Sequence, residues 1–288
     1  MLGILGAAAG VLYGAVTDGA HPIDRAQQLF NATDYQAVVS LLHDAKDARG
    51  LELEGRSYLA LLEHKKATET LEKAVALDPD NSMLHTWLAR ACGHRAETSF
   101  AMTAIHYANR TREEFERAVE LDPSNKHALG DLLDFYVEAP GMVGGGIAKA
   151  EALLPRIEKV DPVGAELGKA RIAEHEKQLE KAEGHLHRAI ELVSGQKESR
   201  AKLHSDLAKF LAHHGRYDES EKAFEAARKD APNSRRIDFD RAETYLHTRH
   251  NKAEARELLK KYIAADNLTP DDPSRAEAAH LLKKAEGN

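Results

Sequence analysis

Apolar and small residues recur along the chain at spacings of three and four, with charged residues between them. In one clear segment Ala67, Leu71 and Ala74 share one face of a helix, and Pro79 comes five residues after Ala74 in the sequence. Because proline pushes the residue before it out of the helical conformation, Asp78 ends this helix. The same pattern predicts seven helices, at residues 34–45, 66–77, 110–121, 147–160, 181–192, 217–230 and 252–265.

The turn that ends these helices is itself repeated. Residues 72–81 (EKAVALDPDN) return at residues 116–125 as ERAVELDPSN. Weaker copies follow at residues 156–162, 188–192 and 224–232. Two helices cross closely only where the contact residues are small, as Gly55, Ala67 and Ala74 are. One such helix pair cannot bury its apolar face alone, so repeated pairs must stack on one another, which predicts an all-α solenoid.

The clearest unit resembles the tetratricopeptide repeat, a helix pair of about 34 residues. The small-residue and proline positions that carry the resemblance are Gly55, Tyr58, Ala67, Leu71, Ala74 and Pro79. The resemblance covers nearly the whole chain and implies a right-handed α-solenoid of about seven hairpins over residues 21–288. A last helix at residues 275–285 is expected to cap it. The resemblance also implies a concave groove, lined by the first helix of each hairpin, that holds a protein or peptide.

The repeat is interrupted first between Pro79 and Pro123. These prolines are 44 positions apart, about ten more than one repeat requires. Residues 84–109 contain no proline and only one glycine, Gly93, so the sequence predicts an unusually long first helix there. It would carry the chain's single tryptophan, Trp87.

The second interruption is a glycine-rich insertion at residues 138–147. Gly144, Gly145 and Gly146 precede a predicted helix, and consecutive glycines there can point several backbone N–H groups at one anion such as a carboxylate. Ile147 and Ala148 follow in place of the Lys and Ser or Thr of a nucleotide-binding loop. The other interpretation is a flexible turn that joins two helices.

Three short motifs together resemble a subgroup of bacterial tetratricopeptide proteins of undefined role. They are the Arg-Ala-Glu at residues 95–97, the Leu-Asp-Pro-x-Asn turn and the glycine-rich loop. This resemblance implies interaction or scaffold work, often in the cell envelope, and it transfers no catalytic residue.

An apolar run from residue 2 to residue 16 begins the chain. It is shorter than the roughly 20 residues that a membrane-spanning helix needs. We interpret residues 1–20 as a signal-peptide-like segment, so we expect export to the periplasm, although no Lys or Arg precedes the run. In the alternative, a cytoplasmic protein, this segment docks on the first repeat.

Composition narrows the classes of function. The formal net charge of −7 argues against a general nucleic-acid binder, which needs an excess of basic residues. A single cysteine, Cys92, excludes an intramolecular disulfide and a multi-cysteine zinc site, and it falls on the packing face of its helix. None of the 16 histidines forms the spaced pair that holds a metal on one helix face. We therefore expect no metal, no cofactor and no catalytic residue.

Projecting the repeat's groove positions through the units gives a candidate binding surface. The projected residues are mostly basic and include two aromatic anchors: Arg49, Arg56, Arg90, Phe135, Arg171, Lys202, Lys209, Arg236 and Phe239. A basic groove on an acidic protein suits an acidic or C-terminal peptide. The Lys and Asn combination of the chaperone-type carboxylate clamp is absent.

Two hypotheses about function follow, with an enzyme as a third. The first is a non-catalytic scaffold or adaptor that binds a peptide or protein segment in the concave groove. The second is a small-ligand or substrate-capture protein, in which the loop at Gly144, Gly145 and Gly146 and the long helix near Arg95 and Glu97 enclose a pocket. The first requires an open groove several repeats long, whereas the second requires a local, pre-formed cavity.

Overall fold

A computed structural model describes residues 22–287 of the chain, so the predicted N-terminal segment at residues 1–20 lies outside the described residues. The described part is helical and contains no strand. Its elements are α1 (Pro22–Asn31), α2 (Tyr35–Leu42), α3 (Ala48–Ala60), α4 (His64–Leu77), α5 (Ser82–Thr98), α6 (Ala101–Leu121), α7 (Lys126–Glu138), the 3-10 turn η1 (Gly141–Val143), α8 (Ile147–Val160), α9 (Pro162–His175), α10 (Leu179–Leu192), α11 (Lys197–His213), α12 (Tyr217–Asp230), α13 (Arg235–His247), α14 (Lys252–Ile263) and α15 (Arg275–Glu286).

The helices form seven antiparallel pairs, from α1 and α2 to α13 and α14, followed by α15. Six of the seven predicted second helices begin and end within a few residues of their observed bounds, and α8 and α12 match at both ends. The predicted all-α solenoid with a closing helix is therefore confirmed.

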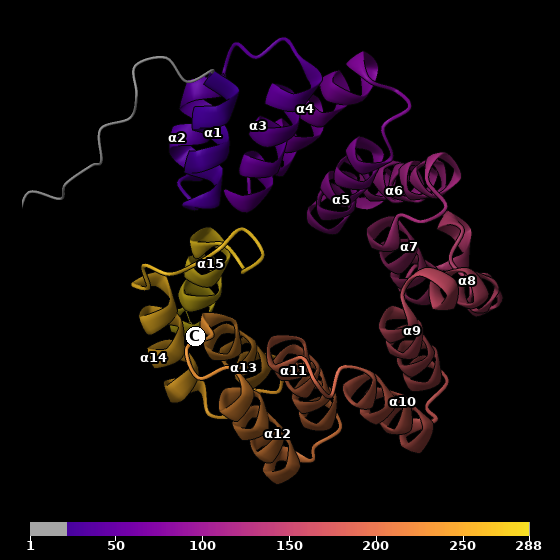
Figure 1. Cartoon of the computed structure of the whole chain (residues 1–288), viewed down its shortest axis with the longest axis vertical. Helices are drawn as coiled ribbons and strands as arrows, with labels where there is room; N and C mark the ends of the chain where they lie inside the picture. Colours follow the sequence, from indigo (N-terminus) through magenta and orange to yellow (C-terminus); the bar gives the residue numbers. More distant parts are fainter. Residues whose placement is uncertain (1–21, 288) are drawn as a thin grey trace, which may run out of the picture.

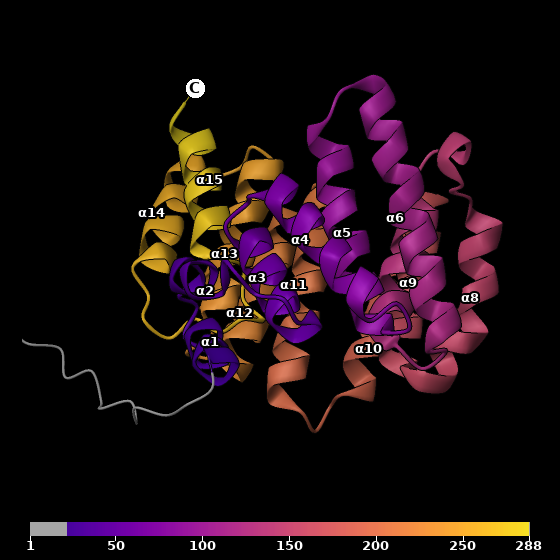
Figure 2. The same ribbon diagram turned by 90° about the horizontal axis from the view of Figure 1, so that it is seen from above.

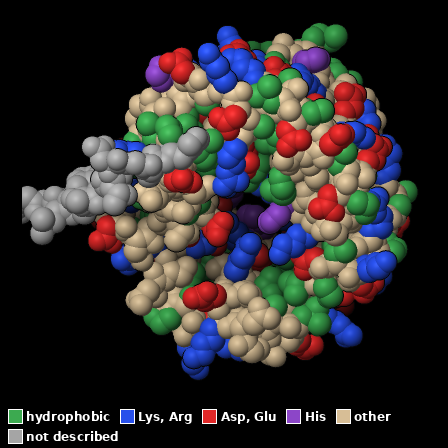
Figure 3. All heavy atoms as spheres, turned by 45° about the horizontal axis from the view of Figure 1, so that its top comes forward, with side chains coloured by type: hydrophobic (Ala, Val, Ile, Leu, Met, Phe, Trp, Pro, Cys, Tyr) green, Lys and Arg blue, Asp and Glu red, His purple; other side chains and the backbone are tan. Residues whose placement is uncertain are grey.

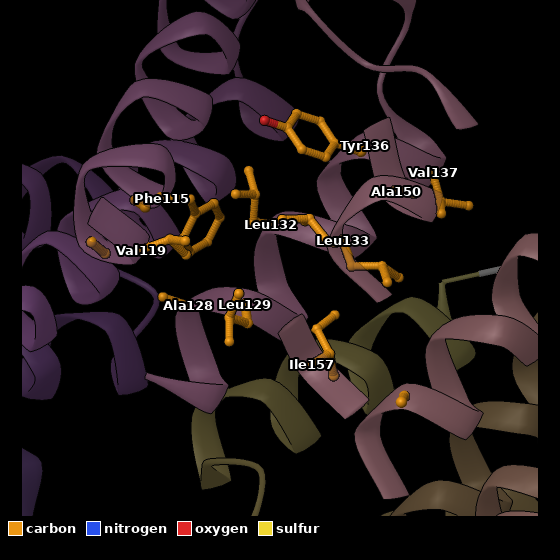
Figure 4. Close-up of a cluster of buried hydrophobic side chains, with 14 of the residues drawn as sticks. Phe115, Val119, Ala128, Leu129, Leu132, Leu133, Tyr136, Val137, Ala150 and Ile157 are labelled. Carbon is orange, nitrogen blue, oxygen red and sulfur yellow. The ribbon is translucent and has the colours of Figure 1, made fainter. Parts of the chain in front are cut away.

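Small residues let the helices approach closely, as the sequence predicts. Ala67 and Ala74 are fully buried, and a Cβ atom added to Gly55 would lie 2.6 Å from Cγ of Leu71. Larger apolar side chains from α6, α7 and α8 then fill the space between neighbouring pairs, as the central cluster in Figure 4 shows. Buried side chains from α5 and α9 join the same cluster, so neighbouring pairs are held together by shared apolar packing.

The first interruption differs from the prediction. The expected single long helix is broken at Ser99 and Phe100, and the extra residues lengthen both members of the pair, to 17 residues in α5 and 21 in α6. The backbone turns through Ala101, whose φ is +39°. Phe100 is 92% exposed at the tip, which extends beyond the neighbouring pairs (Figure 2). The break was not predicted because neither proline nor glycine marks it.

The glycine-rich insertion is a compact turn packed against α6. Gly144 adopts a φ of +95°, which glycine tolerates without strain, and a Cβ atom there would lie 2.5 Å from Cδ of Arg112. A Cβ atom on Gly145 would lie 1.8 Å from the carbonyl oxygen of Ala139. The insertion thus depends on glycine for close packing.

Replacing Gly145 with alanine is expected to destabilise the protein by about 1–3 kcal/mol, because the added methyl group would clash with backbone. Gly184, on the exposed face of α10, is the matched control because a Cβ atom there meets nothing within 4 Å. Gly184→Ala is expected to stabilise by about 0.5–1 kcal/mol. Urea unfolding of both variants measures the difference, and an equal response would contradict the packing described for the insertion.

Successive pairs turn in the same direction until the chain closes into a ring (Figure 1). The odd-numbered helices from α3 onward face the centre, and the even-numbered helices form the outer wall. Where the ends meet, α15 lies against α3, and Arg275 Nη1 donates a hydrogen bond of 2.7 Å to Thr33 Oγ1 in the turn between α1 and α2. Figure 3 shows the resulting hollow, with basic, acidic and histidine side chains in its wall. None of the helices in the described part is long and apolar enough to span a membrane.

Candidate binding surface inside the ring

The residues predicted for the groove all lie on helices of the inner wall. They come from six inner helices: Arg49 and Arg56 on α3, Arg90 on α5, Phe135 on α7, Arg171 on α9, Lys202 and Lys209 on α11, and Arg236 and Phe239 on α13. The two aromatic residues are not exposed anchors. Phe239 is 5% exposed and packs against Tyr262 in the core, and Phe135 is half-buried against the central cluster. The prediction that Phe239 lines the groove is wrong, since a displacement of one residue turns a helical side chain by about 100°.

Arginine and aromatic side chains form a continuous stack from α1 to α5. The guanidinium carbon of Arg56 lies 4.6 Å from the ring centre of Phe30 and 4.4 Å from that of Trp87. Arg90 lies 4.6 Å from the same Trp87 ring. Glu52 accepts a hydrogen bond of 2.9 Å from Arg56 Nη1, which fixes the guanidinium further. The cation–π contacts with Trp87 thus hold both arginines in place.

A cationic patch continues from this stack onto α7 and α11. Arg90 Nε donates to Asp131 Oδ2 at 2.6 Å. His127 of α7 lies within electrostatic range of Arg90, Lys126 and Lys202. Loss of hydration and then these cations lower the pKa of His127, so the imidazole stays neutral at pH 7. With three cations and one carboxylate, Asp131, the patch has an excess of positive charge.

The other half of the inner wall is charge-balanced. Arg171 pairs with Asp134 across α9 and α7. Lys209 Nζ lies 3.2 Å from Asp206 Oδ1 and 3.4 Å from Asp240 Oδ1, and Arg236 also pairs with Asp240, at 2.9 Å. Two of these ion pairs, Arg171–Asp134 and Lys209–Asp240, join neighbouring inner helices. Because carboxylates balance the cations here, the groove is not basic along its whole length. The positive excess is confined to the patch of Arg90, Lys126 and Lys202 around His127.

A cavity of about 210 Å³ opens between α9 and α11. Successive inner helices pack against one another round the described ring except at this position, where the helix backbones stand apart. Its lining combines apolar side chains, among them Leu167, Leu186 and Phe210, with charged ones of both signs: Arg171, Lys209, Glu174 and Asp206. Its size and lining suit one large apolar side chain of a bound polypeptide.

Carboxylates facing the ring interior lose hydration. Burial raises the pKa of Asp134 to about 6 despite its pairing with Arg171, and burial also raises the pKa of Glu243 on α13. A carboxyl whose pKa is higher in the folded state binds more protons when folded. Its contribution to stability is therefore largest below the unfolded pKa near 4, and it declines as the pH rises to about 6.

Asp134→Asn is expected to stabilise the protein at pH 8 by about 1–2 kcal/mol and to leave stability unchanged at pH 4, because the neutral amide resembles the protonated acid. Urea unfolding at both pH values measures this. Asp131→Asn, on the same helix and paired with Arg90, is the control. A loss of stability at pH 8 in Asp134→Asn would show that the pair with Arg171 outweighs the cost of burial.

The second hypothesis from the sequence required free N–H groups in the glycine-rich loop. Each of the three is already bonded: Gly144 N–H donates to the Gly141 carbonyl at 3.0 Å, Gly145 to Pro140 at 3.3 Å and Gly146 to Tyr136 at 2.7 Å. These three N–H groups are therefore not free to hold an anion, which favours the other interpretation, a turn that joins two helices. The guanidinium carbon of Arg95 lies 4.0 Å from the ring centre of Tyr107. The cavity described above lies between α9 and α11, and neither Arg95 nor the glycine-rich loop lines it.

Cys92 as a nucleophile and the histidines as metal ligands are the remaining candidates for chemistry. Cys92 is fully buried, and burial raises the pKa of its thiol to about 12, as befits a packing residue with no nucleophilic role. In the described part of the chain, no group of three His, Cys, Asp or Glu side chains is placed to hold a metal ion.

Sequence reasoning missed three residues of the site: Trp87, Lys126 and His127. Trp87 was noted only as part of the long helix. Lys126 and His127 begin α7, directly after the cap residue Asn125, whose side chain accepts from Ala128 N–H. A basic pair at the start of an inner helix was a visible signal, because such residues lie at the rim of the groove.

Comparison with known proteins supports the fold. A family model described as tetratricopeptide repeat matches residues 206–273. A tetratricopeptide repeat protein from Parabacteroides merdae aligns with a TM-score of 0.55 and 14% identity, covering 92% of this chain and 97% of that one. A thermophilic protein of the same class from Thermus thermophilus gives 0.51 and 21%, covering 69% and 99%. A chain of the APC/C hetero-tetramer Cut9–Hcn1 gives 0.51 and 16%, covering 92% and 48%. No curated protein matches the chain in sequence. The resemblance to tetratricopeptide repeats is confirmed.

Proposed function

We propose that this tetratricopeptide-type ring is a non-catalytic interaction module that binds an extended, acidic segment of a partner protein on its inner face. Proteins of this fold generally bind other proteins, and one structure with the same fold comes from a hetero-tetramer. The observation that carries the finer proposal is the fixed stack of Arg56, Trp87 and Arg90 beside an excess of positive charge.

Charge and shape together favour an extended acidic segment. The guanidinium groups of Arg56 and Arg90 are held by the Trp87 ring, so little side-chain entropy is lost when a carboxylate binds. Lys126 and Lys202 add charge that attracts the segment from solution. The cavity between α9 and α11 supplies an apolar anchor further along the same wall.

The chain's single tryptophan offers a direct test, because Trp87 lies inside the proposed site. The probe is a 20-residue peptide of repeated Glu-Leu-Glu-Ser, titrated into the protein at low salt. We expect a saturable change in tryptophan fluorescence that weakens as salt is added. A Lys-Leu-Lys-Ser peptide of equal length is the control. Equal responses to both peptides, or none to either, would contradict the proposal.

We also propose an exported, periplasmic location, with the apolar run at residues 2–16 as its support. Cell fractionation of a bacterium that expresses the full chain tests this. Recovery in the periplasmic fraction, lost when residues 2–16 are deleted, is the expected result. Recovery in the cytoplasm alone would overturn it.

A further inference from the structure

The ring is closed by a joint of few contacts. At this joint Arg275, the first residue of α15, donates Nη1 to Thr33 Oγ1 at 2.7 Å and Nη2 to the Ala265 carbonyl at 2.6 Å. Only the first of these bonds crosses from the last part of the chain to the first. Thr33 and Arg275 are 242 positions apart in the sequence, so nothing along the chain holds these two residues together.

Apolar packing does not continue across the joint. Around α5 to α9 and again around α9 to α13, single clusters of buried side chains span several neighbouring pairs. At the joint the clusters stay separate: Ala278, Leu281 and Leu282 of α15 pack with the last pair, whereas the cluster of the first pair takes no side chain from α15. Among the interfaces of the described ring, this one therefore lacks the packing that makes the others stable.

The solenoid can open at this point at low cost. Each repeat contacts its neighbours alone, so a small change at every interface adds up to a large displacement of the ends. Separating α15 from α3 and the α1–α2 turn breaks the Arg275–Thr33 hydrogen bond and divides no cluster of buried apolar side chains. Separating any other two pairs would divide a core cluster.

We propose that the joint at which α15 meets α3 and the α1–α2 turn is a gate, through which an internal segment of a partner chain enters the ring. This inference rests on the proposed function of the inner face. A closed ring with no gate would accept only a polypeptide with a free end, which must be threaded through the hollow. A gate lets the ring close round a segment that continues into folded domains on both sides.

Cross-linking tests the gate with the full chain. Thr33→Cys and Arg275→Cys are joined by a reducible bis-maleimide, and buried Cys92 stays unreacted. The probes are the Glu-Leu-Glu-Ser peptide with free ends and the same peptide fused between two folded domains. We expect the linked ring to bind the free peptide normally and the two-domain probe at least tenfold more weakly, with binding restored by reductant. Equal binding of the two-domain probe to linked and unlinked ring would overturn the gate.

A second measurement needs no ligand, so it separates failure of the gate from failure of the proposed function. Spin labels on Gln36→Cys and Lys283→Cys, both at exposed positions on either side of the joint, report its opening by pulsed electron resonance. Thr33→Gly removes the hydrogen-bond acceptor, and glycine suits the φ of +58° at this position, so the turn itself is not weakened. We expect a longer distance to appear in the original chain and to dominate in Thr33→Gly. One short distance in both would overturn the gate, whatever the peptides do.

Discussion

Replacing Lys126 and Lys202 with glutamate is expected to reduce the affinity for the acidic peptide by about 100-fold, an effect of roughly 3 kcal/mol. Both side chains are exposed, and both lie close to His127 in the cationic patch. The double change replaces two attractive charges by two repulsive ones next to Asp131. Because it breaks no ion pair described for these lysines, the fold should be unchanged.

The test is the Trp87 fluorescence titration at low salt, with circular dichroism to confirm folding. Lys65→Glu with Lys222→Glu is the matched control, since these exposed lysines lie on α4 and α12 in the outer wall. The control carries the same change in net charge, so it separates local contact from overall attraction. Equal loss of affinity in both double variants would show that the inner patch has no special role.

Ending the chain at Pro273 is expected to lower the stability of the last helix pair by about 3–5 kcal/mol. Removal of α15 uncovers the core cluster of α13 and α14, which Ala278, Leu281 and Leu282 cover in the full chain. It also removes Arg275 and so opens the ring. The hydrogen bond from Tyr262 Oη to the Pro273 carbonyl is retained in this variant, so the loss reports the helix itself.

Hydrogen exchange resolved along the sequence measures this loss. Amide protection should fall mainly in α13 and α14 and remain in α6 and α7, because stability in a solenoid is a sum over neighbouring interfaces. Removal of residues 287 and 288 alone is the control. Unchanged protection in α13 and α14 would mean that α15 does not act as a cap.

Helix pairs could be predicted from the sequence wherever local chemistry marks their ends. Pro162 and Pro232 follow α8 and α12 closely, and both helices were predicted at their observed bounds. The break at Ser99 and Phe100 has no such mark, and there the prediction failed. Helix ends set by tertiary packing alone leave no local signal.

Charge inside the ring was harder to predict than the helices. Placing Arg171 and Lys209 toward the centre required only the repeat, and the structure puts both on inner helices. Their partners Asp134 and Asp240 come from neighbouring repeats, and the groove projection did not include acidic residues of those helices. Ring closure could not be predicted at all, because it depends on the sum of small rotations over seven helix pairs.

Footprinting of the complex tests the central claim most directly. Hydroxyl-radical labelling of the protein, alone and with saturating Glu-Leu-Glu-Ser peptide, reports which side chains the bound segment covers. The account predicts protection of Trp87 and of other inner-wall side chains on α3, α7 and α11, with no change on α4, α6 and α12. Protection confined to the outer helices, or to Phe100 and Met102 at the exposed tip, would contradict it.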